Sequence, residues 1–366
     1  MELEVRLVQG LNSQYNKILK ICKSQSKNNV IYFGGDVQNL KDVMLASRGD
    51  NKRFVQWSAE NTALLLSKRF PNHNIWIILP SQFYLNTFAS YNNFVPSDKF
   101  GVPEPFISLT SLSFGNSGVC HLVSLLKNFS SSLLCSSQHE KVRLNLPCTT
   151  IIEGDDNDAS RKWIMGIKDV ISGNYWKLVG FSKGCMVLNQ FAHEFSLLTY
   201  LREPTLEVKS RMGESKPVKP LAEIVVKTFF ENITAMYWLD GGHSGPTKRT
   251  WITDPTIVKN FVKNIYDRRI CNSLAKIMNI EVHVTPYQIK CAFRPWIGEE
   301  EAQFSLMIKS EFDANRKRIK DSMTDEPSAR EYLHKLDRDL SFVRKVHFEE
   351  ILPSTIDTHF ELLTHF

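Results

Sequence analysis

The sequence predicts an α/β fold, with a mostly parallel, doubly wound sheet that carries helices on both faces. Short apolar runs rich in β-branched and aromatic residues alternate with segments of helical periodicity along the chain. Most of these runs are apolar throughout, so both faces of the strands are expected to be buried. Six runs carry the prediction, at residues 30–33, 75–79, 175–181, 233–239, 280–284 and 343–348.

Amphipathic segments between the runs predict the helices that cover the sheet. Ser58 is a plausible N-cap for a helix that ends near residue 69, and Asp254 is one for a helix that begins at Pro255. Further helices are expected over residues 118–129, 183–200 and 299–318. The N-terminal segment predicts a strand over residues 3–8 and then a basic helix. A transit peptide is the alternative, against which Glu2 and Glu4 count.

Length and composition predict one globular domain over residues 1–366. Apolar residues make up 42% of the chain and charged residues 23%, so a large core can form without disulfides or structural metals. Two charged stretches without apolar periodicity, residues 201–220 and 321–339, are predicted to be exposed insertions, the first just after the helix that follows Ser182. The 7 cysteines are scattered and form no CxxC pair, which favours a reducing compartment.

The charge and the motifs of the chain exclude several classes of partner and cofactor. The net charge is +6, and the dense basic run at residues 316–320 lies among acidic residues, so we expect a mixed-charge helix face and no nucleic-acid partner. The chain contains no apolar run of about 18 residues, which predicts no transmembrane segment. It also lacks a GxGxxG motif, a P-loop and any His/Asp/Glu cluster with ligand spacing, so no cofactor or metal is predicted.

One motif indicates where chemistry would occur. The segment Gly180-Phe181-Ser182-Lys183-Gly184 follows a β run and precedes a helical run. G-x-S-x-G in this setting predicts a nucleophile elbow, with Ser182 on a strained strand-to-helix turn of an α/β-hydrolase-like fold. The alternative is a glycine-rich turn in another doubly wound fold. The backbone N–H of Lys183 would be one oxyanion donor, while its side chain is expected to be solvated.

A second glycine-bearing loop, Phe33-Gly34-Gly35-Asp36, follows the first predicted buried strand. Hydrolases place a loop here so that a backbone N–H faces the oxyanion. Gly35 or Asp36 would supply that donor. The alternative is a simple turn with an aspartate cap.

The remaining members of a triad are sought after later strands. Asp240 ends a strand run, where a carboxylate can orient a histidine, and the next predicted strand is followed by no carboxylate before Glu299. His359 follows the last strand run, and the order Ser182, Asp240, His359 is that of α/β hydrolases. Three other histidines compete with it: His243, His283 and His365. His243 and Tyr287 are further candidates for lining a pocket.

Several short segments of the sequence resemble those of an uncharacterised animal family, that of the chromosome 2 open reading frame 69 protein. The resemblance covers roughly residues 30–366 and is carried by residues 35–39, 69–72, 180–185, 236–245, 283–288 and 359–360. It implies an α/β-hydrolase-like fold and, in vertebrates, a mitochondrial location, with a cytoplasmic location as the alternative. It supplies no substrate. Cys291 stands where the family has an acidic residue, which again favours Asp240 as the acid.

Together these features predict a serine hydrolase of the esterase, lipase or thioesterase type. Ser182, His359 and Asp240 would act as a triad on a small-molecule acyl ester or thioester. The alternative is a catalytically silent, hydrolase-like scaffold that binds a metabolic partner protein in mitochondria.

Overall fold

The computed structural model describes residues 2–47, 50–98, 102, 104, 115–131, 158–202, 221–242, 250–271, 278–322, 341–351 and 354–366. Their centre is a sheet of 8 strands in the order β1-β2-β4-β3-β7-β8-β9-β10. Its members are β1 (Leu3–Gln9), β2 (Tyr15–Ile21), β3 (Asn28–Phe33), β4 (Asn74–Ile78), β7 (Tyr175–Phe181), β8 (Ile233–Leu239), β9 (Asn279–Val284) and β10 (Phe342–Val346). A small hairpin of β5 (Gln82–Tyr84) and β6 (Phe88–Ser90) lies outside this sheet.

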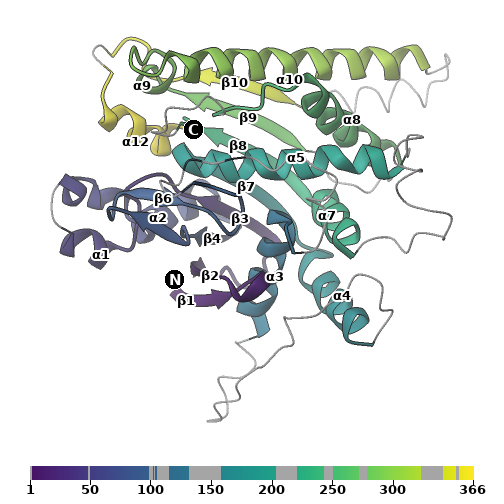
Figure 1. Ribbon diagram of the computed structural model, residues 1–366, viewed down its shortest axis with the longest axis horizontal. Helices are drawn as coiled ribbons and strands as arrows, with labels where there is room; N and C mark the ends of the chain where they lie inside the picture. Colours follow the sequence, from purple (N-terminus) through teal and green to yellow (C-terminus); the bar gives the residue numbers. More distant parts are fainter. Residues whose placement is uncertain are drawn as a thin grey trace.

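The strand directions identify the fold as that of the α/β hydrolases. Strands β4, β3, β7, β8, β9 and β10 run parallel, whereas β2 is antiparallel to both of its neighbours. All six apolar runs predicted as strands lie in this sheet. The carboxyl ends of β9 and β10 point toward the side on which α9 (Pro286–Ile289) and α12 (Ile356–His365) lie (Figure 1). Sites in parallel sheets form at this edge.

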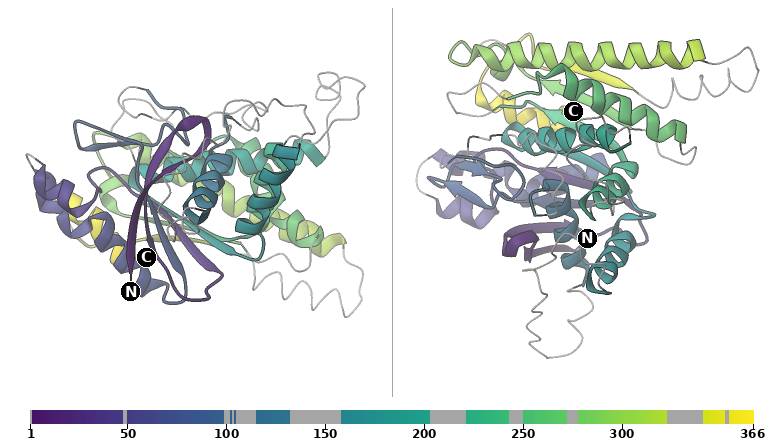
Figure 2. Two further views of the ribbon diagram at one scale, coloured as in Figure 1. Left: turned by 90° about the horizontal axis from the view of Figure 1, so that it is seen from below. Right: turned by 45° about the vertical axis from the view of Figure 1, so that its right-hand side comes forward.

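Helices cover both faces of the sheet, as the sequence predicts (Figure 2). One face packs against α3 (Gly118–Ser131), α4 (Asp158–Ile171), α5 (Cys185–Arg202), α7 (Leu221–Glu231), α8 (Pro255–Cys271) and α10 (Pro295–Ser322). The other packs against α1 (Lys41–Ala46), the 3₁₀ segment η2 (Asp50–Trp57), α2 (Ala59–Arg69) and α12. The predicted insertions at 201–220 and 321–339 fall almost entirely outside the described residues.

Two predicted helix caps are confirmed. The Ser58 hydroxyl accepts a hydrogen bond of 3.4 Å from the backbone N–H of Asn61 at the start of α2. Asp254 Oδ1 accepts from the N–H groups of Thr256 (2.8 Å) and Ile257 (3.3 Å) at the start of α8. Each cap satisfies N–H groups that the first turn of a helix leaves without an intrahelical acceptor.

The basic helix predicted after β1 is wrong, because this segment forms strand β2. Ile18 and Ile21 are fully buried, and β2 pairs with β1 on one side and with β4 on the other. The Lys20 ammonium lies 3.9 Å from the centroid of the Trp76 ring, so the basic side chain covers the sheet instead of a helix face. Pairing with two strands outweighs the local basic composition.

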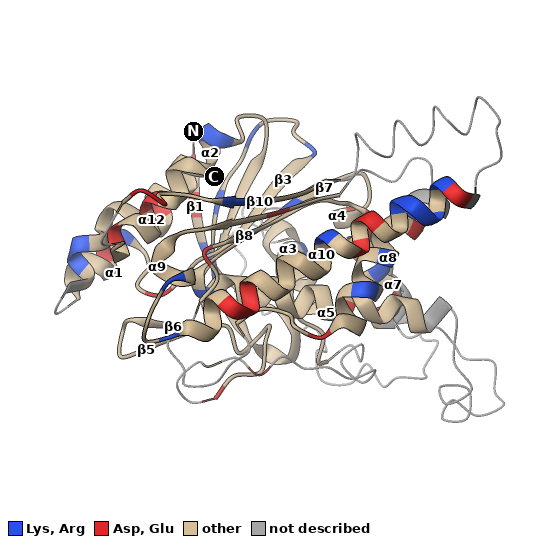
Figure 3. Cartoon of the chain, turned by 90° about the horizontal axis from the view of Figure 1, so that it is seen from above, with Lys and Arg blue, Asp and Glu red and all other residues tan. Residues whose placement is uncertain are grey.

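The mixed-charge face predicted on the long C-terminal helix is confirmed. Acidic and basic side chains alternate along α10 (Figure 3). The Arg316 guanidinium lies 3.8 Å from Asp313, and that of Arg318 lies 3.4 Å from Asp267 on α8. No helix within the described ranges has the length and apolar character needed to cross a lipid bilayer.

Glu194 gives the fold a pH dependence that can be measured. Its carboxylate, fully buried on α5, accepts hydrogen bonds from Ser117, Gln190 and the first two N–H groups of α3. Burial raises its pKa from 4.5 to about 7. The folded protein therefore holds this proton more tightly than the unfolded chain, and the associated stability is lost as the pH rises from about 4.5 to about 7.

We expect Glu194→Gln to flatten this part of the stability profile, because glutamine has no proton to lose. Urea unfolding at pH 5 and pH 8 measures the effect. The difference between the two pH values should shrink by up to about 3 kcal/mol relative to the unsubstituted protein. An unchanged difference would show that Glu194 does not titrate in this range.

Candidate active site

The segment around Ser182 is a tight strand-to-helix turn between β7 and α5. Ser182 follows the last residue of β7 and has a φ of 53°, a left-handed conformation that is rare for serine. A Cβ on Gly180 would lie 2.8 Å from the Gly184 carbonyl oxygen. A Cβ on Gly184 would overlap the carbonyl group of Phe33 on the neighbouring strand. Both glycines are therefore needed for the turn to pack against β3 and α5.

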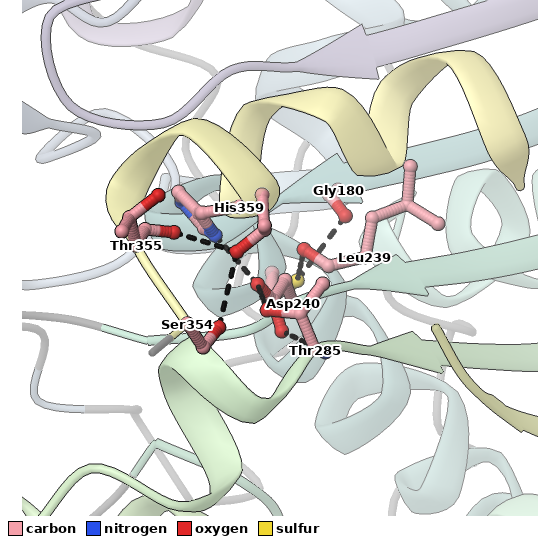
Figure 4. Close-up of polar contacts among 9 residues, drawn as sticks. Gly180, Leu239, Asp240, Thr285, Ser354, Thr355 and His359 are labelled. Atoms are coloured by element: carbon pink, nitrogen blue, oxygen red, sulfur yellow. Dashed lines mark hydrogen bonds and ion pairs between the residues drawn. The ribbon is translucent and has the colours of Figure 1, made fainter. Parts of the chain in front are cut away.

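Asp240 and His359 meet at the carboxyl edge of the sheet, although 119 residues separate them (Figure 4). The His359 Nδ1 lies 2.6 Å from Asp240 Oδ2. The same carboxylate accepts hydrogen bonds from the backbone N–H (2.7 Å) and the hydroxyl (2.6 Å) of Thr285. Asp240 is fully buried and, like Ser182, has a positive φ, of 48°. Its bonds fix a proton on Nδ1 of His359 and leave Nε2 as the basic nitrogen.

The imidazole of His359 is enclosed by two aromatic rings. The Phe181 ring stacks on it with a centroid distance of 4.5 Å, and the Tyr287 ring lies 5.2 Å away. Phe181 immediately precedes Ser182, so the elbow itself places one wall around the histidine. The first turn of α12 is held by the Thr358 hydroxyl, which donates to the Thr355 carbonyl (2.6 Å). His359 is thus 4% exposed and held in one orientation.

In the loop after β3, the structure distinguishes between the two residues predicted as oxyanion donors, Gly35 and Asp36. The Gly35 N–H donates to Gln38 Oε1 (2.9 Å), and Gln38 in turn donates to the Trp57 carbonyl (3.1 Å). Gly35 is therefore engaged within the loop, which leaves the N–H of Asp36 as the candidate. The close approach of the loop to Ser182 explains why residue 35 is glycine, since a Cβ there would lie 2.6 Å from Ser182 Cβ.

Gln38 holds the loop after β3 in place, a role that its residue type alone does not indicate. It is 2% exposed, and its Oε1 also accepts from the Tyr32 hydroxyl (2.8 Å). From the other side, the Tyr91 hydroxyl donates to the Gly34 carbonyl (3.0 Å), and Asp36 Oδ1 accepts from the N–H of Ala89 (2.7 Å). The loop is therefore fixed before any ligand binds, as an oxyanion donor requires.

The expectation that the Lys183 side chain is solvated is wrong. The side chain is 3% exposed, and its Nζ lies 4.0 Å from Asp36 Oδ1. Burial lowers the pKa of Lys183, and the carboxylates of Asp36 and Asp98 oppose that change. Burial also raises the pKa of Asp36, against the effect of Lys183. The residues next to Lys183 in the sequence do not indicate that its side chain points into the protein.

The competing histidines lie elsewhere or outside the described residues. His283 is fully buried on β9 and bonds to His347 Nε2 (2.9 Å) and Glu281 Oε2 (3.0 Å). His365 packs against Phe348, with a ring distance of 4.9 Å. His243 lies outside the described residues. Within the described part of the chain, no three His, Cys, Asp or Glu side chains come together as metal ligands would.

Searches of solved structures return hydrolases and esterases at low similarity. The dienelactone hydrolase from Anabaena variabilis is 10% identical, with coverage of 100% of this chain and 95% of the other, at a TM-score of 0.29. The esterase domain of a Rhodothermus marinus protein is also 10% identical, covering 100% and 96%, at a TM-score of 0.31. The strand order and the turn at Ser182, rather than these likenesses, identify the fold.

Sequence relatives are much closer. The human mitochondrial protein C2orf69 is 33% identical over 303 residues, which cover 77% of this chain and 66% of the human protein. The zebrafish (Danio rerio) homolog is 29% identical over 351 residues, covering 94% of this chain and 76% of its own. The sequence profile of the C2orf69 family matches residues 4–162 and 151–315. The chain therefore belongs to the C2orf69 family of mitochondrial proteins.

Proposed function

We propose that this protein is a serine hydrolase that cleaves an acyl ester or thioester. The observation that carries the proposal is the 2.6 Å contact between His359 Nδ1 and the buried carboxylate of Asp240, at the edge of the sheet where Ser182 occupies a strained turn. A carboxylate that holds the imidazole in this tautomer is what a serine nucleophile needs from its partners.

The proposed reaction proceeds in two halves. His359 Nε2 takes the proton of Ser182 Oγ as the oxygen attacks the acyl carbonyl, and the backbone N–H groups of Lys183 and Asp36 donate to the oxyanion. The intermediate collapses, and the alcohol or thiol leaves with the proton from His359. Water then attacks the acyl-serine with His359 as base, which releases the acid and restores the enzyme.

The contacts of Asp240 favour turnover over a silent scaffold. Burial of a carboxylate is costly unless hydrogen bonds compensate it. Asp240 has donors from Thr285 on one side and the imidazole on the other. What distinguishes this pair from the Glu281–His283 pair is its place at the carboxyl edge of the sheet, next to the strained turn at Ser182.

A fluorophosphonate probe tests the proposal directly, because it reacts only with an activated serine. We expect the purified protein to be labelled and Ser182→Ala to remain unlabelled. Ser124→Ala is the matched control, since Ser124 is also buried but only donates to the Cys120 carbonyl within α3. It should be labelled like the unsubstituted protein. If the unsubstituted protein is not labelled, or if Ser182→Ala is labelled equally, the result would support the alternative, a silent scaffold that binds a partner protein.

A further inference from the structure

Among the described residues, the buried Lys183 ammonium next to Ser182 has one ion-pair partner, the Asp36 carboxylate. The side chain is 3% exposed, and its nearest carboxylate oxygen, on Asp36, is 4.0 Å away. A hydrogen bond to an ammonium group spans about 2.7–2.9 Å when the acceptor is charged. Asp36 therefore lies near enough to act on the charge of Lys183 but too far to accept one of its N–H bonds.

This arrangement leaves the ammonium poorly compensated. An ammonium group has three donors, and removing it from water is costly unless they are used. Asp36 Oδ1 is already occupied by the backbone N–H of Ala89. Asp98 is exposed, and its Oδ1 accepts from the N–H of Val102. A third acceptor that enters from the site would supply what these two carboxylates do not.

The ammonium belongs to the residue that follows Ser182, and its carboxylate neighbour belongs to the loop that packs on Ser182. Lys183 directly follows Ser182, and Asp36 directly follows Gly35, whose backbone approaches the Ser182 side chain. The groups that act electrostatically on Asp36 are all basic, namely Lys183, His359 and Arg294. Arg294 extends over the Tyr287 ring, which in turn contacts His359. The cationic side chains of Lys183 and Arg294 therefore come from two separate segments that flank the Asp36 loop and the His359 ring.

We propose that the Lys183 ammonium binds a carboxylate carried at the end of a short acyl chain, so that the enzyme prefers acid-ended esters or thioesters to neutral ones. This inference rests on the proposed hydrolase function. A singly charged carboxylate suits the site better than a dianionic phosphate, because Asp36 and Asp98 would repel the second charge. A charge-assisted hydrogen bond to a buried partner corresponds to a preference of about 10- to 100-fold.

The test compares two esters of matched chain length on the full chain. The mono-p-nitrophenyl ester of glutaric acid carries one carboxylate, and p-nitrophenyl valerate is its neutral counterpart. We expect kcat/KM to be at least about 10-fold higher for the acid-ended ester. In Lys183→Met the ratio of the two kcat/KM values should fall to near one. The exposed Lys290 provides the matched control, and Lys290→Met should keep the ratio.

A second variant keeps the inference testable if Lys183→Met does not fold. Asp36→Asn removes the competing carboxylate but retains an oxygen for the Ala89 N–H, so the preference for the acid-ended ester should increase. A ratio near one in the unsubstituted protein, a ratio unchanged by Lys183→Met, or no increase in Asp36→Asn would overturn the inference.

The outcomes also separate the inference from the function on which it depends. If the unsubstituted protein is labelled by the fluorophosphonate but hydrolyses neither ester, the inference fails while the hydrolase function stands. If it is neither labelled nor active on either ester, both fail. If the two esters are hydrolysed at equal rates, the proposed role of Lys183 is refuted and the hydrolase function stands.

Discussion

Replacement of Asp240 by asparagine is expected to lower kcat for ester hydrolysis by about 10⁴-fold. The backbone N–H of Thr285 donates to Oδ1, so the amide oxygen of an asparagine would take that position. The amide NH₂ would then face His359 Nδ1 in place of Oδ2. This contact favours the tautomer with the proton on Nε2, which cannot accept the proton of Ser182.

The fold offers a control for this prediction in a second carboxylate–histidine pair. Glu281 Oε2 lies 3.0 Å from Nε2 of the buried His283, whose ring stacks on His347. Glu281→Gln should leave kcat within about threefold, because none of the side-chain hydrogen bonds that Glu281 and His283 make within the described residues involves Ser182, Asp240 or His359. Equal losses in the two variants would point to a general loss of stability, and an active Asp240→Asn would remove Asp240 from the triad.

Substitution of Gly184 by alanine is expected to be the most destabilising single-methyl change in the elbow. The added Cβ would overlap the carbonyl group of Phe33 and would lie 2.9 Å from the carbonyl oxygen of Gly34. These atoms are backbone of β3 and of the loop that follows it, so no side chain can rotate away. We expect the free energy of unfolding to fall by about 3 kcal/mol or more, as measured by urea denaturation.

Gly115→Ala is the matched control for that substitution. A Cβ at residue 115 would meet only the side-chain amide of Asn12, at 3.7 Å, which is ordinary van der Waals contact. Its free energy of unfolding should change by less than about 1 kcal/mol. A similar loss in both variants would mean that the packing of β3 against the elbow does not limit stability.

Most of the sheet could be predicted because its central strands β3, β4, β7 and β8 are nearly continuous apolar runs with clear ends. The exception is β2, whose lysines at positions 17 and 20 disguise a strand with the composition of a basic helix. Its conformation depends on β1 and β4, which pair with it from both sides, and no property of the segment alone reveals those partners. The polarity of the residues in β2 does not follow their burial either, since Asn16 is buried and Tyr15 is exposed.

In the site, sequence order indicated which residues to compare but not how their groups are used. The motif around Ser182 and the positions of Asp240 and His359 after strands are visible as patterns. The inward turn of Lys183 and the capture of the Gly35 N–H by Gln38 are not, because each depends on side-chain packing between loops far apart in the chain. The segment at residues 35–39 contains Gln38, but a glutamine at this position does not by itself predict a hydrogen bond to the Gly35 N–H.

The place of His359 on α12 has a consequence for how the protein is made. Ser182, the loop after β3 and Asp240 all precede α12 in the chain. A chain that is still emerging from a ribosome, or still crossing a membrane with its N-terminal end first, can form the nucleophile turn while it lacks the base. On the proposed mechanism such an intermediate is inert toward esters. Docking of α12, through Phe360 against Phe54 and Trp57, is the step that would switch it on.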